Sequence, residues 1–151
     1  MSTITTARAG LGAGIDPRGP RFAASLTSVV LALVLVTPTP VAVTVLFLQT
    51  VVFAIGALRG IQHTPYAWLF RSLVRPRLGA PHELEDPRPP RFAQAVGLGF
   101  AGVGLLGFAA GLTATALVAT GLALAAALLN AVFGFCLGCE IYLLLQRATA
   151  R

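Results

Sequence analysis

Four long runs without a charged residue are the feature that most constrains how this chain folds. The runs cover residues 22–36, 41–58, 92–110 and 112–135, and apolar character continues to residue 145. About 20 residues of helix cross the hydrocarbon core of a bilayer, and a chain in lipid must satisfy its backbone hydrogen bonds internally. The runs lack the period-two alternation of a membrane barrel. The sequence therefore predicts an all-α membrane protein with four transmembrane helices.

The charge composition supports this class and argues against a nucleic-acid-binding protein. Only 11% of the 151 residues are charged, compared with about 25% in a soluble domain. The net charge is +6, but the 11 basic residues, all arginine, stand between the apolar runs. That distribution is typical of topology signals and of contacts with anionic lipid headgroups. We expect the lipid bilayer as a partner and no nucleic acid.

The arginines also predict the orientation of the chain. The connections at 37–40 and 110–113 carry no charge, whereas the amino-terminal segment, the connection 59–91 and the carboxyl-terminal segment carry every arginine. By the positive-inside rule, both termini and the long connection face the cytoplasm, and we expect the chain in the inner (cytoplasmic) membrane. We expect no cleavable signal peptide. Residues 1–15 are expected to form a flexible tail, and residues 16–151 a single membrane domain.

An eight-residue motif occurs twice in the chain. D-P-R-G-P-R-F-A at 16–23 and D-P-R-P-P-R-F-A at 86–93 differ at one position. Each copy precedes two apolar runs. This arrangement predicts two parallel two-helix repeats, a first half over about residues 16–80 and a second half over 86–147, related by an axis along the membrane normal.

Within each motif the prolines and arginines have predicted roles. Proline suits the first turn of a helix, because its missing N–H is not needed there. Arginine in that turn opposes the helix dipole, so its charge needs an anionic partner: a lipid phosphate, or the motif aspartate of the opposite half. We predict a structural anchor containing Asp16, Pro20, Asp86 and Pro90. We predict lipid or anion contacts for Arg18, Arg21, Arg88 and Arg91. A ligand site built from both copies is the alternative.

Two further patterns concern the remaining elements. Residues 65–78 place apolar side chains three and four residues apart with arginines between them, which predicts a short amphipathic helix at the inner membrane surface. The third run holds five glycines between residues 97 and 107, and Gly111 follows it directly. Small residues let helices approach closely in lipid, so we expect tight packing of this helix, or alternatively a contact within a homo-oligomer.

Both cysteines stand at the end of the fourth run, in F-C-L-G-C-E at 135–140. On a helix, residues three apart share a face, so the sulfurs of Cys136 and Cys139 can meet each other or one partner. Disulfide exchange, half of a metal site, and two small buried residues all fit this spacing. Gly138 lets a backbone or a partner come near. In the register of the motif, the first half has Tyr66 and Leu69 at the cysteine positions.

The length of the fourth run places the cysteine pair near the cytoplasmic interface. The reducing cytosol disfavours a permanent disulfide there but allows a transient one. His63 and His82 are the other candidate metal ligands, but nothing in the sequence fixes them near the cysteines, and we predict neither a metal nor a cofactor. Asn130, the strongly polar residue deep in the last run, is expected to hydrogen-bond across the helices, or to line a pore if one exists.

Together these residues resemble a known bacterial membrane family, domain of unknown function 4395. The resemblance covers about residues 14–147, and its most specific parts are the two motif copies and the ending F-C-x-G-C-x-x-Y at 135–142, with Phe135 and Tyr142 at its ends. The family implies no defined chemistry. It implies gene neighbours that include thioredoxin-like proteins and sulfurtransferases, which favours thiol or sulfur chemistry.

The preferred function is a thiol-redox partner. Cys136 and Cys139 would exchange electrons with a cytosolic thioredoxin-like protein, as a component of a thiol–disulfide oxidoreductase system. The first alternative is a transport or binding module for a small sulfur compound. The second is a non-catalytic membrane assembly factor.

Overall fold

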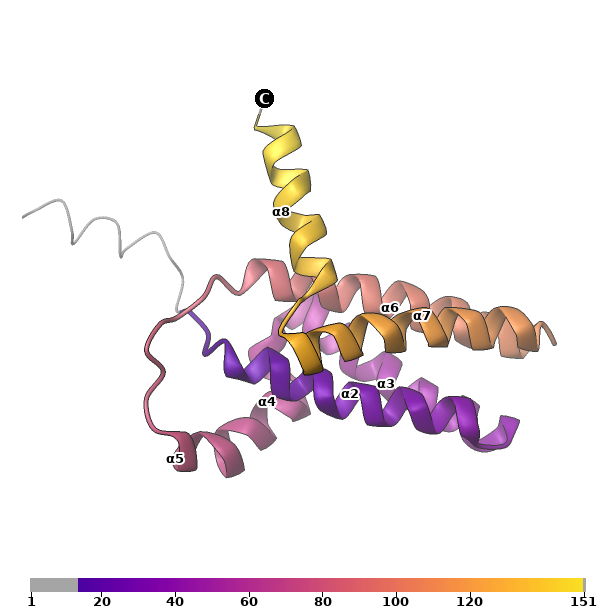
Figure 1. Ribbon diagram of the computed structural model, residues 1–151. Coiled ribbons are helices and arrows are strands. Elements are labelled where there is room, and N and C mark those ends of the chain that lie inside the picture. Colours follow the sequence, from indigo (N-terminus) through magenta and orange to yellow (C-terminus); the bar gives the residue numbers. More distant parts are fainter. Residues whose placement is uncertain (1–13, 151) are drawn as a thin grey trace, which may run out of the picture.

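The computed structural model describes residues 14–150, and its regular elements are helices (Figure 1). The four long ones are α2 (Arg18–Val36), α3 (Thr39–Arg59), α6 (Arg88–Ala109) and α7 (Thr113–Phe133). The shorter ones are η1 (Ile61–His63), α4 (Pro65–Leu69), the π-helical turn η2 (Phe70–Val74), α5 (Arg75–Leu78) and α8 (Leu137–Thr149). The predicted tail at residues 1–15 lies outside the described residues, apart from residues 14 and 15.

All four long helices are apolar and long enough to cross a membrane. This confirms the four spans expected from the apolar runs and indicates a multi-pass membrane protein. The first span, α2, ends just before a proline. Thr37, which precedes Pro38, has the extended conformation (φ −100°, ψ 157°) that a following proline favours.

Each long helix packs against two others. Helix α2 lies against α3 and α7, and α6 lies against the same two helices. The first helix of each half therefore contacts the second helix of both halves. Figure 1 shows the four helices running side by side, with the turns α2–α3 and α6–α7 at one end and the starts of α2 and α6 at the other.

Glycines on α6 allow the close approach of α3. A Cβ atom on Gly97 would lie 2.8 Å from Cε1 of Phe53, and one on Gly104 would lie 2.9 Å from Cδ2 of Leu46. Leu46 and Phe53 are both buried in the core. The glycine-rich composition of the third run is thus explained, at these positions, by side chains of α3 that occupy the space a larger residue would need.

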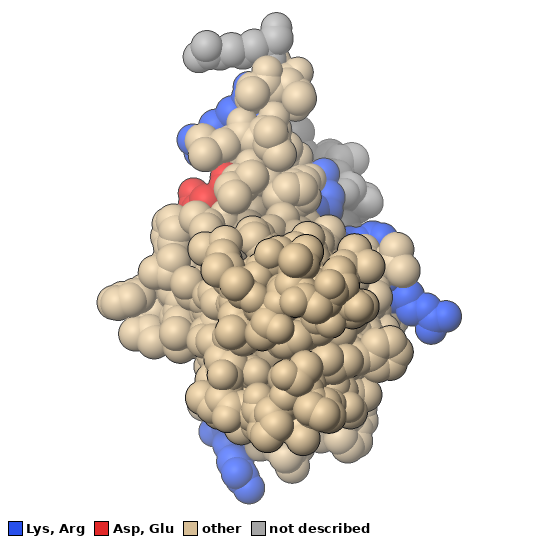
Figure 2. All heavy atoms as spheres, turned by 90° about the vertical axis from the view of Figure 1, so that its right-hand side faces the viewer, with Lys and Arg blue, Asp and Glu red and all other residues tan. Residues whose placement is uncertain are grey.

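The two ends of the molecule differ in charge. Figure 2 looks onto the end that carries the turns α2–α3 and α6–α7, and the face toward the viewer is free of charged side chains; arginines protrude only around its edge. Arginine-bearing segments tend to stay on the cytoplasmic side of a membrane. A charge-free end therefore suits the opposite side.

Two shorter helical segments lie at the arginine-bearing end. Residues 65–78 are helical as predicted, but as three segments, α4, η2 and α5. Helix α8 is an additional helix that the sequence did not predict. Figure 1 shows it projecting away from the four long helices.

We predict that Gly107→Ala destabilises the protein by about 1–3 kcal/mol, the usual cost of overpacking. A Cβ on Gly107 would lie 3.0 Å from the backbone nitrogen of Ala116, so α7 would have to move. The matched control is Gly102→Ala on the same helix, where a Cβ meets no atom within 4 Å. This control should be neutral or up to about 1 kcal/mol stabilising. Unfolding in detergent micelles measures both, and equal losses would contradict the proposed packing.

Candidate functional site

The cysteine pair lies at a corner between α7 and α8. Helix α7 ends at Gly134, whose left-handed conformation (φ 68°) is one that residues other than glycine rarely adopt. Cys136 is the N-cap of α8, and its sulfur accepts a hydrogen bond of 3.3 Å from the backbone N–H of Cys139. The sulfurs of Cys136 and Cys139 lie at disulfide distance, with their Cα atoms 5.2 Å apart.

This geometry corrects the placement of both cysteines on one continuous helical face. Only Cys139 is inside a helix; Cys136 stands before it, with an extended backbone (φ −85°, ψ 101°). The end of α7 at Gly134 is not apparent in the apolar run, because a glycine there is compatible both with close helix packing and with the end of a helix. Hydrophobicity alone therefore gave no sign of the corner.

The start of α8 is docked on the second copy of the motif. A Cβ on Gly138 would lie 2.7 Å from Cα of Ala93, so only glycine fits this contact with α6 without a backbone shift. The rings of Phe92 and Tyr142 pack with their centroids 5.7 Å apart. Ala93 and Phe92 are the last two letters of the motif, which therefore positions the cysteine corner.

The first half contains a matching arrangement with different residues. Thr64 is the N-cap of α4, and its hydroxyl accepts a hydrogen bond of 3.2 Å from the N–H of Ala67. The motif ring Phe22 packs on Phe70 with a centroid distance of 5.7 Å. The structural counterparts of Cys136 and Cys139 are therefore Thr64 and Ala67. The motif register places Tyr66 and Leu69 at these positions instead, because the two halves differ in length between the motif and this helix.

The second arginine of each motif hydrogen-bonds to the end of a helix in the other half. Arg21 of α2 donates to the carbonyl oxygens of Ala131 (3.1 Å) and Val132 (2.9 Å) at the end of α7. Arg91 of α6 donates to those of Ala57 and Leu58 at the end of α3, both at 2.7 Å. We call these two contacts the arginine caps. Each offsets the unfavourable position of a cation at a helix start, because a cation is favourable at a helix C-terminus.

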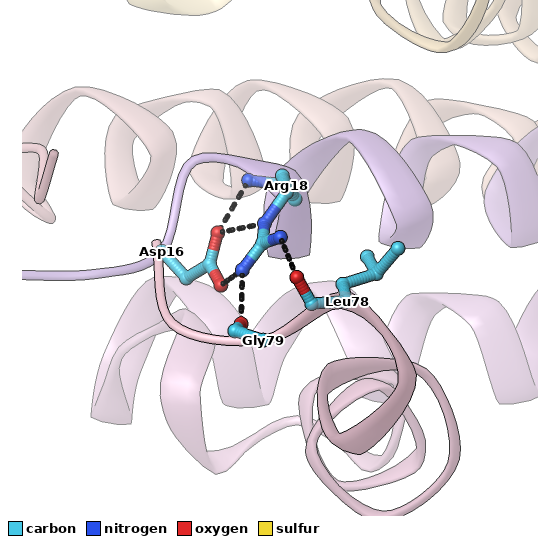
Figure 3. Close-up of polar contacts among 4 residues, drawn as sticks. All are labelled: Asp16, Arg18, Leu78 and Gly79. Carbon is cyan, nitrogen blue, oxygen red and sulfur yellow. Dashed lines mark hydrogen bonds and ion pairs between the residues drawn. The ribbon is translucent and has the colours of Figure 1, made fainter. Parts of the chain in front are cut away.

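The motif aspartates have local partners, which corrects the expected pairing with the opposite half. Asp16 accepts hydrogen bonds from the backbone and the guanidinium of Arg18, and Asp86 accepts the equivalent bonds from Arg88. Figure 3 shows that Arg18 also donates to the carbonyl oxygens of Leu78, the last residue of α5 (3.3 Å), and of Gly79, which follows it (3.0 Å). The lipid contacts predicted for these arginines remain a prediction.

A backbone contact joins the two halves just before the motifs. Ile15 and Glu85 exchange two N–H to O=C hydrogen bonds, each 2.9 Å long, in an antiparallel bridge. These residues directly precede Asp16 and Asp86, so equivalent positions of the two halves pair with each other. Pro20 and Pro90 are each the third residue of their helix.

A cavity of about 550 Å³ lies between the helices at the arginine-bearing end of the molecule. Its lining is mostly apolar and includes Phe53, Phe70 and Phe100. Cys136 contributes to the lining, and so does Asn130, whose side chain makes no hydrogen bond within the described residues. The hydrogen bond expected for Asn130 is therefore not observed.

Within residues 14–150, no group of three or more His, Cys, Asp or Glu side chains is placed to hold a metal ion, so His63 and His82 do not complete such a group with the cysteines.

The pKa of the Asp16 carboxyl lies below its ordinary value, chiefly because the Arg18 guanidinium donates hydrogen bonds to it. Arg88 lowers the pKa of Asp86 in the same way. A carboxyl group whose pKa is lower in the folded chain than in the unfolded chain stabilises the fold at any pH above the unfolded pKa. This stabilisation is lost as the pH falls through the folded-state pKa. We therefore expect the melting temperature to fall below about pH 4.

Asp16→Asn should reduce this pH dependence more than Asp86→Asn, because the Asp16 side chain is 8% exposed and that of Asp86 is 32% exposed. Melting curves of both variants between neutral and acidic pH test this ranking. Equal losses, or a larger loss for Asp86→Asn, would contradict it.

The comparison with known proteins places the chain in a family. Residues 15–147 match the family described as Domain of unknown function (DUF4395). No curated protein and no solved structure matches the chain at a significant level. The family match covers most of the chain and agrees with the resemblance carried by the motif copies and the cysteine ending. The chain therefore belongs to the DUF4395 family.

Proposed function

We propose that the protein is a membrane thiol–disulfide exchange partner in which Cys136 and Cys139 cycle between dithiol and disulfide. The observation that carries this proposal is the cysteine corner: two sulfurs at disulfide distance, with one of them at the N-cap of a helix. The partner is a soluble cytosolic protein of the thioredoxin-like class. The whole of residues 16–151 acts as one domain in this proposal.

The proposed frame is a four-helix bundle of two parallel two-helix repeats in the inner membrane. Both termini and the segment α4–α5 face the cytoplasm, with α4–α5 lying at the interface as an amphipathic element. Support comes from the matched contacts of the two motif copies and from the charge-free opposite end. This orientation puts the cysteine corner on the cytoplasmic side, where a soluble partner can reach it.

The local geometry favours thiolate character at Cys136. A helix N-terminus carries partial positive charge, and the Cys139 N–H points at the Cys136 sulfur. The same features lower the cost of a thiolate in reactive cysteines generally. Because a stabilised thiolate is the better leaving group, a partner thiolate should attack the sulfur of Cys139 and release Cys136.

The exchange then balances in two steps. The partner's first thiolate forms a mixed disulfide with Cys139, and the Cys136–Cys139 bond breaks. The partner's second thiolate attacks its own sulfur in the mixed disulfide and releases Cys139. Two electrons move from the partner dithiol to this chain, which ends as the dithiol. The reverse sequence reduces an oxidised partner.

We predict that Cys136→Ser forms a lasting mixed disulfide with a thioredoxin whose resolving cysteine is replaced by serine and whose remaining cysteine carries a 2-nitro-5-thiobenzoate leaving group. Cys139 displaces that group, and neither protein then holds a thiol that can resolve the mixed disulfide. Cys139→Ser should trap much less. Non-reducing gels followed by mass spectrometry identify the linked cysteine. The double variant is the control and should trap nothing. If neither single variant captures thioredoxin while the double variant keeps full function in cells, the redox proposal is wrong.

Arg21→Gln should slow exchange with thioredoxin several-fold, whereas Arg91→Gln should leave it within about twofold. Both substitutions remove an arginine cap, so both should lower stability by roughly 1 kcal/mol. Only Arg21 caps α7 next to the corner, with its Nη1 atom 3.9 Å from where a Gly134 Cβ would lie. Stopped-flow exchange kinetics and melting curves of the two variants measure both effects. Equal slowing would show that the cap acts through general stability.

A further inference from the structure

The cavity beside the cysteine corner is built asymmetrically around one sulfur. Cys136 and Gly138 line it, whereas Cys139 is not among the lining residues. Its walls come from all of the described helices, from η1 and η2, and from the segments that precede α2 and α6. At about 550 Å³ the cavity has the size of a typical small-molecule pocket (roughly 300–1,000 Å³). Cys136 therefore faces an internal space that a small apolar molecule can fill.

Three buried or half-buried polar side chains, from three helices, line this mostly apolar space without a hydrogen-bond partner. They are Thr27 of α2, Gln94 of α6 and Asn130 of α7, and none makes a side-chain hydrogen bond with the described part of the chain. Thr27 is informative because it is only 6% exposed. Buried polar groups usually find a hydrogen-bond partner, so the Thr27 hydroxyl points to a ligand that accepts hydrogen bonds. Gln94 and Asn130 are half-buried and line the same cavity.

The other buried or half-buried hydroxyls of the long helices make clear that Thr27 is an exception. Ser28, Thr50 and Thr120 each donate to the carbonyl oxygen four residues earlier, at 2.7–2.8 Å. Thr27, on the same helix as Ser28, makes no such bond among the described residues. Its hydroxyl is left available to an occupant of the cavity.

We infer that this cavity binds a lipophilic quinone, which accepts electrons from the reduced Cys136–Cys139 pair. The inference rests on the thiol-exchange function proposed above, because a pair that has oxidised its partner must be reoxidised. A quinone dissolves in the bilayer, presents two carbonyl oxygens as hydrogen-bond acceptors, and takes up two electrons. Membrane quinones are the terminal oxidants of other bacterial thiol systems.

The electron balance of this step is complete. Cys136 and Cys139 lose their two thiol hydrogens, and a sulfur–sulfur bond forms between them. The two electrons and two protons convert the two quinone carbonyls into the hydroxyls of a hydroquinone. Thr27, Gln94 and Asn130 hold the carbonyl oxygens, and Cys136, the sulfur that lines the cavity, reacts with the ring. Cys139 then attacks Cys136 and closes the disulfide.

The test uses the full-length protein in lipid nanodiscs, with ubiquinone-1 as the probe. After reduction and removal of reductant, we expect one ubiquinone-1 reduced for each disulfide formed, followed by loss of quinone absorbance and by mass spectrometry. Thr27→Val should raise the KM for ubiquinone-1 by roughly three- to tenfold, the effect of one neutral hydrogen bond. Thr120→Val is the matched control: it removes a buried threonine hydroxyl that lies outside the cavity lining, and should leave the KM unchanged.

Binding without chemistry is measured separately on the Cys136→Ser/Cys139→Ser double variant. Saturable binding of one ubiquinone-1 per chain, weakened by adding Thr27→Val, supports the inference. No binding, or equal effects of Thr27→Val and Thr120→Val, overturns it. Occupation by a lipid chain that ubiquinone-1 does not displace also overturns it.

The outcomes also separate this inference from the proposed function. If thioredoxin exchange proceeds while ubiquinone-1 neither binds nor oxidises the pair, the quinone site is wrong and the exchange function stands. If ubiquinone-1 oxidises the pair while thioredoxin does not exchange with it, the quinone site stands and the proposed partner is wrong.

Discussion

The arrangement of the helices depends on two arginines that lie at helix starts and bond to helix ends. The last carbonyl groups of any helix lack intrahelical partners, and at a membrane boundary they need donors. Arg21 supplies them to α7, and Arg91 supplies them to α3. Each contact joins one half of the chain to the other. The cost of a cation at a helix start is offset by the same contact.

This frame sets the position of the corner that bears the cysteines. Arg21 fixes the end of α7, and the motif residues Phe92 and Ala93 receive the start of α8. In the first half the equivalent start of α4 carries Thr64, whose hydroxyl caps the helix just as the Cys136 sulfur caps α8. The helix starts at Thr64 and Cys136 are thus capped in the same way, by a hydroxyl in one and by a sulfur in the other. The proposed thiol exchange depends on this difference, because only the second position carries a sulfur.

The sequence predicted the parts of this fold that depend on the length of the apolar runs and on the residues that end a helix. The apolar runs and the pair Thr37–Pro38 predicted the spans, and the spacing of apolar residues predicted helix over 65–78. The corner at Gly134 was missed, because a glycine in an apolar run carries no sign of its φ angle. The acceptors of Arg21 and Arg91 were missed because they depend on which helices meet. The unpartnered hydroxyl of Thr27 is equally invisible in sequence, since other threonines of the spans bond locally.

The side and redox state of the cysteine pair test the central claim most directly. A membrane-impermeant maleimide can be applied to intact cells and to inverted membrane vesicles, each with and without prior reduction. The account predicts that Cys136 and Cys139 react only in inverted vesicles and only after reduction. Labelling in intact cells would contradict the cytoplasmic placement. Failure of both cysteines to react in reduced inverted vesicles would contradict their role in thiol exchange.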